Sequence, residues 1–231
     1  MSRQTPVKVI IFDAYGTLFD VYSVTALADA LYPGRGAELA ALWRQKQLEY
    51  SWLRAMSAHY KPFWEITRDA LRFARLRLGL NLSLEQEQRL MDQYGRLSAF
   101  SENHEVLLTL KRRGFKLGIL TNGNREMIDR SVQSAGLEGV FDLILTSDQV
   151  DVFKTLPQMY ALGPTGFGCE VSEIGFVSSN AWDAVASKWF GYQSFWVNRV
   201  GLPMEQLDVE DLPEGRSLAD AADFYAQKVV S

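Results

Sequence analysis

Cysteine and histidine are scarce in this sequence of 231 residues, which contains one cysteine, Cys169, and two histidines, His59 and His104. A single cysteine excludes an intrachain disulfide framework and a cysteine-ligated zinc site, and it favours a reducing cytoplasm. Both histidines are expected at the surface. The sequence therefore favours neither histidine acid–base chemistry nor a histidine metal site.

Long apolar runs and an excess of positive charge are also missing. No run is long enough to span a bilayer, and Met1–Lys8 lacks the apolar stretch of a signal peptide. The net charge is −4 and the pI is near 5.3, so no basic footprint for nucleic acid is indicated. With 47% hydrophobic and 23% charged residues, the composition predicts an ordinary globular protein that binds neither membrane nor nucleic acid.

Five short apolar runs predict buried strands. They are Val7–Phe12, Lys116–Leu120, Leu143–Thr146, Ile174–Val177 and Phe195–Val197. Helix-like stretches such as Arg125–Ala135 and Ala181–Phe190 lie between the later runs. Alternation of strands and helices predicts an α/β fold with a parallel sheet and helices on both faces.

The interval after the first strand is far longer than a normal crossover, since more than a hundred residues separate the first two predicted strands. The segment from about Val21 to Arg96 has a mostly helical pattern. We therefore predict a core formed by residues 1–18 and 99–231, with a helical cap, residues 19–98, inserted after the first strand.

The strongest helical pattern in the cap covers Glu38–Met56 and has two apolar stripes. One stripe comprises Leu39, Leu42, Trp43, Tyr50 and Leu53, and the other comprises Ala41, Leu48, Trp52 and Met56. One face is expected to pack inside the cap, and the other against the core or a partner chain. Because an exposed apolar patch usually marks an interface, we predict a homodimer; packing of the second stripe on the core is the alternative.

Polar side chains follow several predicted strands, at the edge where ligands bind in parallel sheets. Asp13 follows the first strand, Thr121 and Asn122 the second, Lys154 the third, and Ser178, Asn180 and Asp183 the fourth. Each alone has an ordinary explanation, because such residues often cap helices or lie in solvent. Their convergence on one edge predicts a reaction site instead.

The motifs at these positions resemble the haloacid dehalogenase superfamily through FDAYGT, LTNG, the isolated Lys154 and SSNAWD. Three longer segments, FDAYGTLFDVYSV, LWRQKQLEYSWLRA and FVSSNAWDA, are similar to the L-2-haloacid dehalogenase subgroup. The resemblance extends from Val7 to Arg199. It implies a doubly wound, Rossmann-type core with a helical cap, and hydrolysis of L-2-haloacids to 2-hydroxy acids of inverted configuration.

The residue two positions after Asp13 distinguishes two chemistries within this superfamily. Phosphatases that resemble this family have a second Asp there as the acid–base for a leaving alkoxide, together with magnesium, whereas this sequence has Tyr15. A departing halide needs no proton, and a lysine can replace the metal beside a singly charged substrate. We therefore expect no metal and no cofactor.

The resemblance assigns roles to fifteen residues. Those implied in the reaction are Asp13 as nucleophile, Lys154, Asp183, Arg44, Ser178, Asn180 and Thr17. Those implied in substrate binding are Tyr15, Thr121, Asn122, Gln45, Leu48, Phe63, Tyr160 and Trp182. Arg44, Asn122 and Trp182 match the halide site, where donors and a ring edge would face the anion. The partners are then a 2-haloacid, halide and water.

Three departures from the subgroup pattern stand out. Thr121 replaces the more usual Ser, and Thr155-Leu156-Pro157 replaces Pro-Asp-Pro after Lys154. Gly163-Pro164 is expected to interrupt the following helix, because proline lacks an N–H and clashes with the preceding turn. Two rival functions remain at this point, a phosphatase of the same superfamily and a non-catalytic binding protein that would tolerate loss of Asp13.

Overall fold

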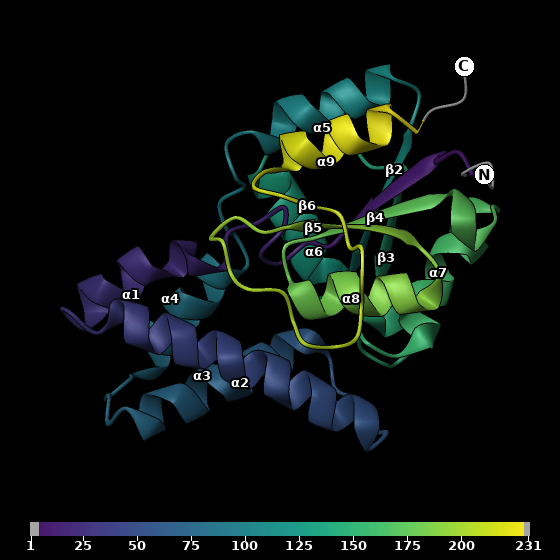
Figure 1. The fold of residues 1–231 in the computed structure, drawn as a ribbon. Coiled ribbons are helices and arrows are strands. Elements are labelled where there is room, and N and C mark those ends of the chain that lie inside the picture. Colours follow the sequence, from purple (N-terminus) through teal and green to yellow (C-terminus); the bar gives the residue numbers. More distant parts are fainter. Residues whose placement is uncertain (1–4, 229–231) are drawn as a thin grey trace.

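The computed structural model describes residues 5–228, which form a parallel sheet flanked by helices and, beside it, a group of helices (Figure 1). All strand pairs are parallel, and the strand order is β3-β2-β1-β4-β5-β6. The strands are β1 Val9–Phe12, β2 Lys116–Thr121, β3 Leu143–Thr146, β4 Ile174–Ser178, β5 Gln193–Val197 and β6 Glu214–Gly215. This order confirms the predicted doubly wound α/β core.

The five predicted strands are present, with small shifts at their ends. The first begins at Val9 rather than Val7, because the Val7 amide donates to the Lys228 carbonyl outside the sheet. A sixth strand, β6, was not predicted, because its two residues, Glu214 and Gly215, carry no apolar pattern.

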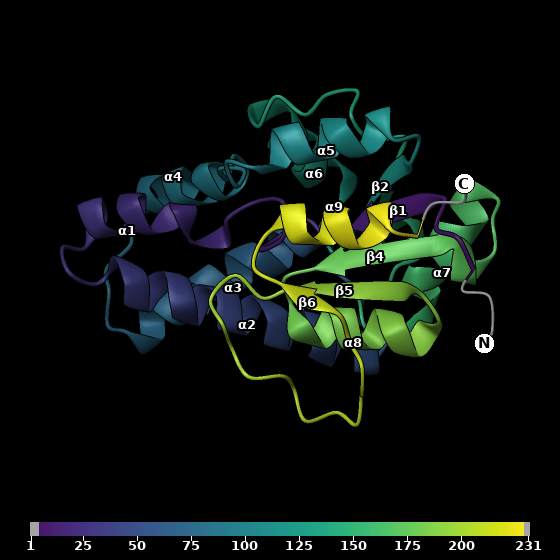
Figure 2. The same cartoon turned by 45° about the horizontal axis from the view of Figure 1, so that its top comes forward.

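Helices cover both faces of the sheet, as Figure 2 shows. The helices of the core are α5 Asn103–Arg112, α6 Arg125–Ser134, α7 Pro157–Phe167, α8 Ala181–Phe190 and α9 Leu218–Ala226, with short 3-10 helices η2 Ser147–Gln149 and η3 Val171–Glu173. Alternate residues of β1 face opposite layers: Ile10 and Phe12 join the α5, α6 and α9 side, and Val9 and Ile11 join the α7 and α8 side. No helix within residues 5–228 is long and apolar enough to cross a membrane.

Helix α7 is continuous through Pro164, so the predicted interruption at Gly163-Pro164 is wrong. A proline at this position leaves the carbonyl of Tyr160, four residues earlier, without its helical donor. The Tyr192 hydroxyl donates to that carbonyl instead. Gly163 makes this possible, because a Cβ there would lie 2.2 Å from the Tyr192 hydroxyl oxygen. An external donor and a missing side chain together accommodate the proline.

The helical group between β1 and α5 is the predicted cap. It comprises η1 Val21–Val24, α1 Thr25–Leu31, α2 Gly36–Met56, α3 Phe63–Arg77 and α4 Leu84–Tyr94. The two segments that connect it to the core lie side by side, since the Asp20 amide donates to the Ser98 carbonyl at 2.8 Å and Phe19 forms an antiparallel bridge with Ala99. We propose that the boundaries lie here, at 18/19 and 98/99.

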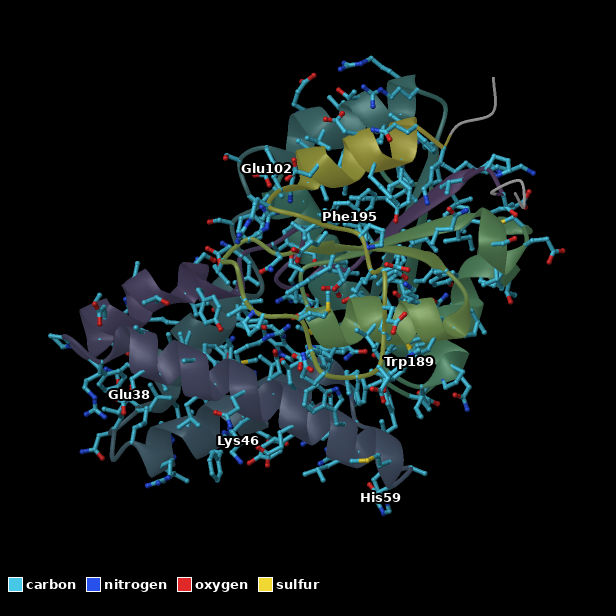
Figure 3. All side chains as sticks on the ribbon, in the orientation of Figure 1. Glu38, Lys46, His59, Glu102, Trp189 and Phe195 are labelled. Carbon is cyan, nitrogen blue, oxygen red and sulfur yellow. The ribbon has the colours of Figure 1, made fainter. Side chains whose placement is uncertain are left out.

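The two apolar stripes of α2 have different surroundings. On the first stripe, Leu39 and Trp43 are buried within the cap, while Leu53 at its end is 52% exposed. On the second stripe, the Trp52 ring packs edge-on against Trp182 of α8, with ring centroids 5.5 Å apart. The cap therefore contacts the core through this stripe. Beyond the C-terminal end of α2, the His59 side chain is exposed (Figure 3).

Candidate active site

The site lies where the strand order reverses, between the carboxyl ends of β1 and β4. Asp13 directly follows β1, and Ser178 is the last residue of β4. The Asp13 amide donates to the Val177 carbonyl at 2.9 Å, which extends the pairing of the two strands by one residue. In an open parallel sheet this switch point is the usual ligand site. The sheet thus fixes the Asp13 backbone before any side-chain contact is made.

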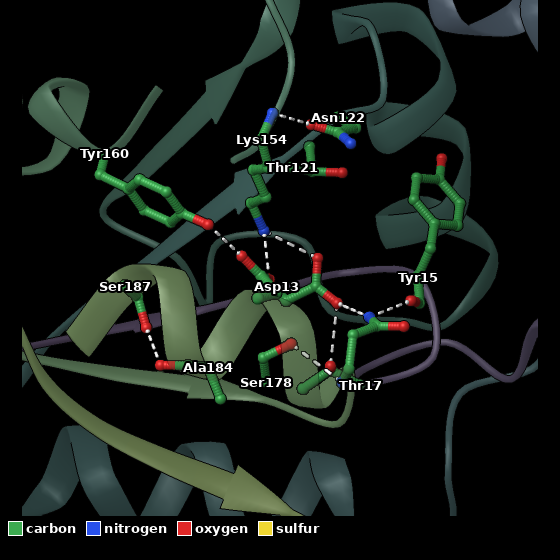
Figure 4. A network of polar contacts seen from close by, with 12 residues as sticks. Asp13, Tyr15, Thr17, Thr121, Asn122, Lys154, Tyr160, Ser178, Ala184 and Ser187 are labelled. Carbon is green, nitrogen blue, oxygen red and sulfur yellow. Dashed lines mark hydrogen bonds and ion pairs between the residues drawn. The ribbon is translucent and has the colours of Figure 1, made fainter. Parts of the chain in front are cut away.

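Three donors converge on the Asp13 carboxylate (Figure 4). Lys154 Nζ lies 2.9 Å from Oδ1, while Thr17 Oγ1 and Asn180 Nδ2 lie 3.0 and 2.8 Å from Oδ2. The residue is only 5% exposed. Opposite charge and hydrogen bonds both favour the ionised form of a carboxylate. The Asp13 carboxylate is therefore buried and held in one orientation by three donors, in a position where it can act as a nucleophile.

A second contact determines the direction in which the Thr17 hydroxyl donates. The Ser179 amide donates to Thr17 Oγ1 at 2.7 Å, so the hydroxyl proton is directed to Asp13. Gly16, which lies between Asp13 and Thr17 in the sequence, has φ +97°, a left-handed conformation that glycine adopts without strain. The turn after β1 thereby brings Thr17 back over Asp13.

Lys154 bridges the carboxylates of Asp13 and Asp183, and Figure 4 shows its contact with Asp13. Its Nζ lies 2.8 Å from Asp183 Oδ2, and the Tyr160 hydroxyl donates to Asp183 Oδ1 at 2.7 Å. Burial disfavours the charge on Lys154, yet the two carboxylates outweigh it and raise the pKa of the ammonium above its usual value. Burial raises the pKa of Asp183 to about 6, against the opposing effect of Lys154. Asp183 can therefore exchange a proton near neutral pH.

The loop that carries Lys154 is held by its backbone. The Lys154 amide donates to Asn122 Oδ1 at 2.8 Å, and Ser147 Oγ donates to the Asn122 carbonyl at 2.7 Å. On the other side of the site, Ser178 Oγ accepts from the Asn180 amide at 3.1 Å and so orients the residue that donates to Asp13. With Thr155-Leu156-Pro157 following it, Lys154 still reaches both carboxylates.

Thr121, the last residue of β2, is fully buried beside this loop. Its Oγ1 accepts a hydrogen bond from the Gly123 amide at 3.0 Å. A hydroxyl that accepts in this way keeps its proton available for another partner. Thr121 can therefore donate to an anion at the carboxyl end of β2.

Arg44 is the cap residue that reaches the core site. Its Nη2 lies 3.2 Å from the Tyr15 carbonyl and 3.4 Å from Asn180 Oδ1, and its Nη1 lies 2.7 Å from Gln47 Oε1. Tyr15 lies two residues after Asp13 in the sequence, and Asn180 donates a hydrogen bond to Asp13. The guanidinium is thus placed beside the nucleophile, with five donors in a planar fork.

Aromatic and apolar side chains surround the site from both domains. Tyr15 and Phe63 are almost fully buried with ring centroids 6.2 Å apart, and Leu48 and Trp182 are half-buried. Gln45 differs, because it is exposed and lines a groove on the outside of the cap beside Glu38 and Arg77. Its expected place at the substrate stays a prediction.

Three further polar or aromatic residues lie around the site and were not predicted from the sequence. Gln47 bonds to Arg44 from one turn along α2, Asn124 of the core accepts from the Trp64 amide at 3.2 Å, and Phe153 packs against the Phe63 ring with centroids 5.8 Å apart. A polar residue at a buried helical position was the available signal for Gln47. No sequence signal indicated Asn124, whose partner is 60 residues away.

The described residues contain no group of three or more His, Cys, Asp or Glu side chains arranged to hold a metal ion. The charged groups of the site are one ammonium, one guanidinium and two carboxylates. A desolvated carboxylate at the end of the first strand, paired with a lysine and covered by a helical cap, defines a class of α/β enzymes that use aspartate as a nucleophile.

The chain belongs to the haloacid dehalogenase-like hydrolases, whose family model matches residues 7–191. Among curated relatives, an (S)-2-haloacid dehalogenase from Pseudomonas sp. (strain YL) is 49% identical over 201 residues, 87% of each chain. Haloacetate dehalogenase H-2 from Moraxella sp. (strain B) is 41% identical over 201 residues, 87% of this chain and 90% of its own. These findings confirm the predicted family and subgroup.

A solved structure shows the same architecture. The L-2-haloacid dehalogenase from Xanthobacter autotrophicus with chloropropionic acid covalently bound superimposes with a TM-score of 0.89 at 34% identity, covering 95% of this chain and 98% of its own. Similarity over both the cap and the core therefore extends to a protein in which a haloacid is attached to the enzyme.

Proposed function

We propose that this protein is an (S)-2-haloacid dehalogenase, which hydrolyses L-2-haloacids to 2-hydroxy acids with inversion at C2. The observation that carries the proposal is the buried ion pair between Lys154 Nζ and Asp13 Oδ1 at 2.9 Å, with Tyr15 where a phosphatase has its second carboxylate. Of the curated relatives named above, the Pseudomonas protein is an (S)-2-haloacid dehalogenase by name and the Moraxella protein is a haloacetate dehalogenase.

The first chemical step is an attack by the Asp13 carboxylate on C2 of the haloacid. The C–X bond breaks with its electron pair passing to the halide, and an ester to Asp13 forms. Lys154 pairs with the Asp13 carboxylate, and Thr17, Ser178 and Asn180 orient it. The covalent chloropropionate in the Xanthobacter protein is consistent with such an ester. A covalent intermediate divides one difficult displacement into two easier steps.

The second step is attack by water on the carbonyl carbon of the ester. Asp183 takes the proton from this water, and Lys154 and Tyr160 orient the Asp183 carboxylate. The ester C–O bond to the Asp13 carbonyl carbon breaks, and the leaving alkoxide takes up the proton from Asp183 to give the 2-hydroxy acid. The second proton of the water passes to solvent, which restores the Asp13 carboxylate. A base with a pKa of about 6 is suited to this transfer near neutral pH.

Substrate recognition divides between the two parts of the molecule. Thr121 and nearby backbone N–H groups bind the substrate carboxylate, while Arg44, Asn122 and Trp182 receive the halide. The side chains that line the rest of the pocket are apolar or uncharged: Tyr15, Leu48 and Phe63. Such walls exclude water, which strengthens the electrostatic interactions inside the pocket.

The test follows the oxygen atoms. In a single turnover in heavy-oxygen water, we expect the label to enter Asp13 and the 2-hydroxy acid to carry unlabelled oxygen. Label that appears directly in the product would mean that water attacks C2 itself. A second experiment distinguishes the proposal from the phosphatase alternative. It compares halide release from L- and D-2-haloacids in the presence of EDTA with phosphate release from phosphate esters in the presence of magnesium.

We further propose a homodimer located in the cytoplasm. Leu53 and Met56 at the end of α2 are 52% and 74% exposed, and apolar side chains of this size on a helix favour contact with a second copy. Light scattering at micromolar concentration is expected to give twice the 26.1 kDa chain mass, and a mass near that of one chain would refute the dimer. Cys169 as the only cysteine favours the reducing compartment.

A further inference from the structure

Gln47 is a fully buried polar side chain on α2, one helical turn after Arg44, and 0% of it is exposed. A buried amide must find hydrogen-bond partners, since leaving it unpaired destabilises the fold. Its partners come from three helices of the cap: Arg44 on α2, Thr67 on α3 and Tyr94 on α4. The amide therefore joins these helices at a single point.

The orientation of the amide follows from the Thr67 hydroxyl. Thr67 Oγ1 donates to the Phe63 carbonyl at 2.8 Å, so it offers only a lone pair to Gln47. Gln47 Nε2 donates to that lone pair at 2.6 Å. The amide nitrogen must then face Thr67, and Oε1 must face the opposite way, toward Arg44.

Gln47 Oε1 uses both of its lone pairs. It accepts from Arg44 Nη1 at 2.7 Å and from the Tyr94 hydroxyl at 3.0 Å. Tyr94 is itself immobilised, because it is 2% exposed and stacks on the Tyr15 ring with centroids 5.9 Å apart. The oxygen that holds the guanidinium is thus fixed in position from both sides.

The acceptor that holds Arg44 carries no charge. The other two contacts of the guanidinium, the Tyr15 carbonyl and Asn180 Oδ1, are also neutral oxygens. A carboxylate at position 47 would hold the Arg44 guanidinium in the same place, but its negative charge would pair with the positive charge of Arg44. A neutral amide orients the guanidinium and leaves its positive charge for an anion.

We propose that Gln47 is a positioning residue that fixes the Arg44 guanidinium through a neutral acceptor, so that the full charge of Arg44 meets the departing halide. This inference rests on the proposed dehalogenase function and on the role of Arg44 in it. Gln47 touches neither the substrate nor the reacting atoms, and it acts through Arg44 alone.

The proposal predicts a dependence on the leaving group. As the C–X bond breaks, negative charge develops on the halogen, and an oriented donor stabilises this transition state more than the ground state. Chloride is a poorer leaving group than bromide, and bromide than iodide, so displacement of chloride demands the most stabilisation. Loss of Gln47 should therefore slow chloride release most and iodide release least.

The experiment measures single-turnover halide release from (S)-2-chloro-, 2-bromo- and 2-iodopropionate by wild type, Gln47→Met and Gln47→Glu. Gln47→Met keeps the size of the side chain and removes the acceptor, and we expect chloride release to fall about tenfold, which corresponds to one hydrogen bond to a charged group. Gln47→Glu keeps the acceptor, and we expect a similar loss because the carboxylate neutralises Arg44. Iodide release should change less in both variants.

Glu87→Gln is the matched control within the cap. Glu87 on α4 accepts two hydrogen bonds from Arg72 on α3, at 2.7 and 2.9 Å, outside the site. This variant should lower the melting temperature and leave the chloride-to-iodide ratio unchanged. It shows what loosening of the cap does by itself.

An equal loss for all three halides in both Gln47 variants would overturn the inference, because it would indicate a purely structural effect. Gln47→Glu with wild-type rates would overturn it as well, even if Gln47→Met failed to fold. Absence of halide release by the wild-type protein would overturn the proposed function itself, whereas an unchanged halide ratio in active variants overturns the role of Gln47 alone.

Discussion

The core and the cap present charge to the site in opposite ways. In the core, Lys154 lies within 2.9 Å of both Asp13 and Asp183, so its charge is fully paired. In the cap, Arg44 is held by three neutral oxygens. On the proposed mechanism, the core pairs the charges around the nucleophile, while the cap keeps a positive charge for the departing halide. Nucleophile activation and leaving-group stabilisation would then belong to different domains.

The strongest test of the core's part is Asp13→Asn. The amide cannot form the ester, so we expect single-turnover halide release to fall by at least about 10⁴-fold. The fold should persist, because the single amide oxygen of asparagine still accepts from Lys154. Circular dichroism and the melting temperature control for folding, and activity within tenfold of wild type would exclude Asp13 as the nucleophile.

Lys154→Met tests whether the core charges depend on one another. Removal of the ammonium leaves two buried carboxylates without their cation, and breaking such a pair typically costs about 3–5 kcal/mol. We expect urea denaturation at neutral pH to show a loss of this size in the free energy of unfolding. A loss below about 1 kcal/mol would mean that the carboxylates do not need Lys154 as their partner.

Arg44→Ala is the corresponding change in the cap. Because its partners are neutral, removal should alter the melting temperature little, while halide release should fall roughly 10²–10³-fold, as for loss of one preorganised donor. Arg44→Lys keeps the charge but not the planar fork and should also be impaired. An Arg44→Ala protein that melts early yet reacts at a normal rate would assign Arg44 a structural role instead.

The pH dependence of ester hydrolysis tests Asp183. Burial raises its pKa to about 6, and a base must be ionised to accept a proton, so hydrolysis should slow about tenfold for each pH unit below its pKa. The acid limb of the pH–rate profile should lie at or below pH 6. The negative charge of Asp13 contributes to raising the pKa of Asp183, and esterification removes that charge.

Tyr160→Phe sharpens the same test, because the Tyr160 hydroxyl stabilises the ionised Asp183 carboxylate. Its removal should raise the pKa of Asp183, so the acid limb should move to higher pH. Stopped-flow measurement of product formation from preformed ester gives both profiles. A limb that stays fixed or moves to lower pH would contradict Asp183 as the base.

Asn124 connects the two domains, and its removal should have the smallest effect. Helix α3 begins after Pro62, which offers no side-chain acceptor, and Asn124 Oδ1 of the core accepts from the Trp64 amide instead. Loss of a helix cap costs about 1 kcal/mol, so Asn124→Ala should raise KM a few-fold at unchanged kcat. Asn124→Asp keeps the acceptor and should behave as wild type; equal effects of both changes would exclude this connection.

The sequence determined the sheet and the order of chemical groups along its edge. Apolar runs followed by polar residues predict parallel strands, and parallel strands bring their carboxyl ends together whatever the details of packing. Asp13, Lys154 and Asp183 could therefore be predicted to meet from chain order alone. The family resemblance, which the comparisons confirm, extended this reasoning to Arg44, for which chain order gives no position.

Only the tertiary structure decided contacts that depend on where separate helices pack. The continuity of α7 through Pro164 requires the Tyr192 hydroxyl, 28 residues further on, and a proline rule applied to the local sequence cannot anticipate it. The amide orientation of Gln47 likewise depends on Thr67 and Tyr94 from two other helices. Periodicity reports which face of an element is apolar, whereas the partner of a buried polar group is set by the packing of distant segments.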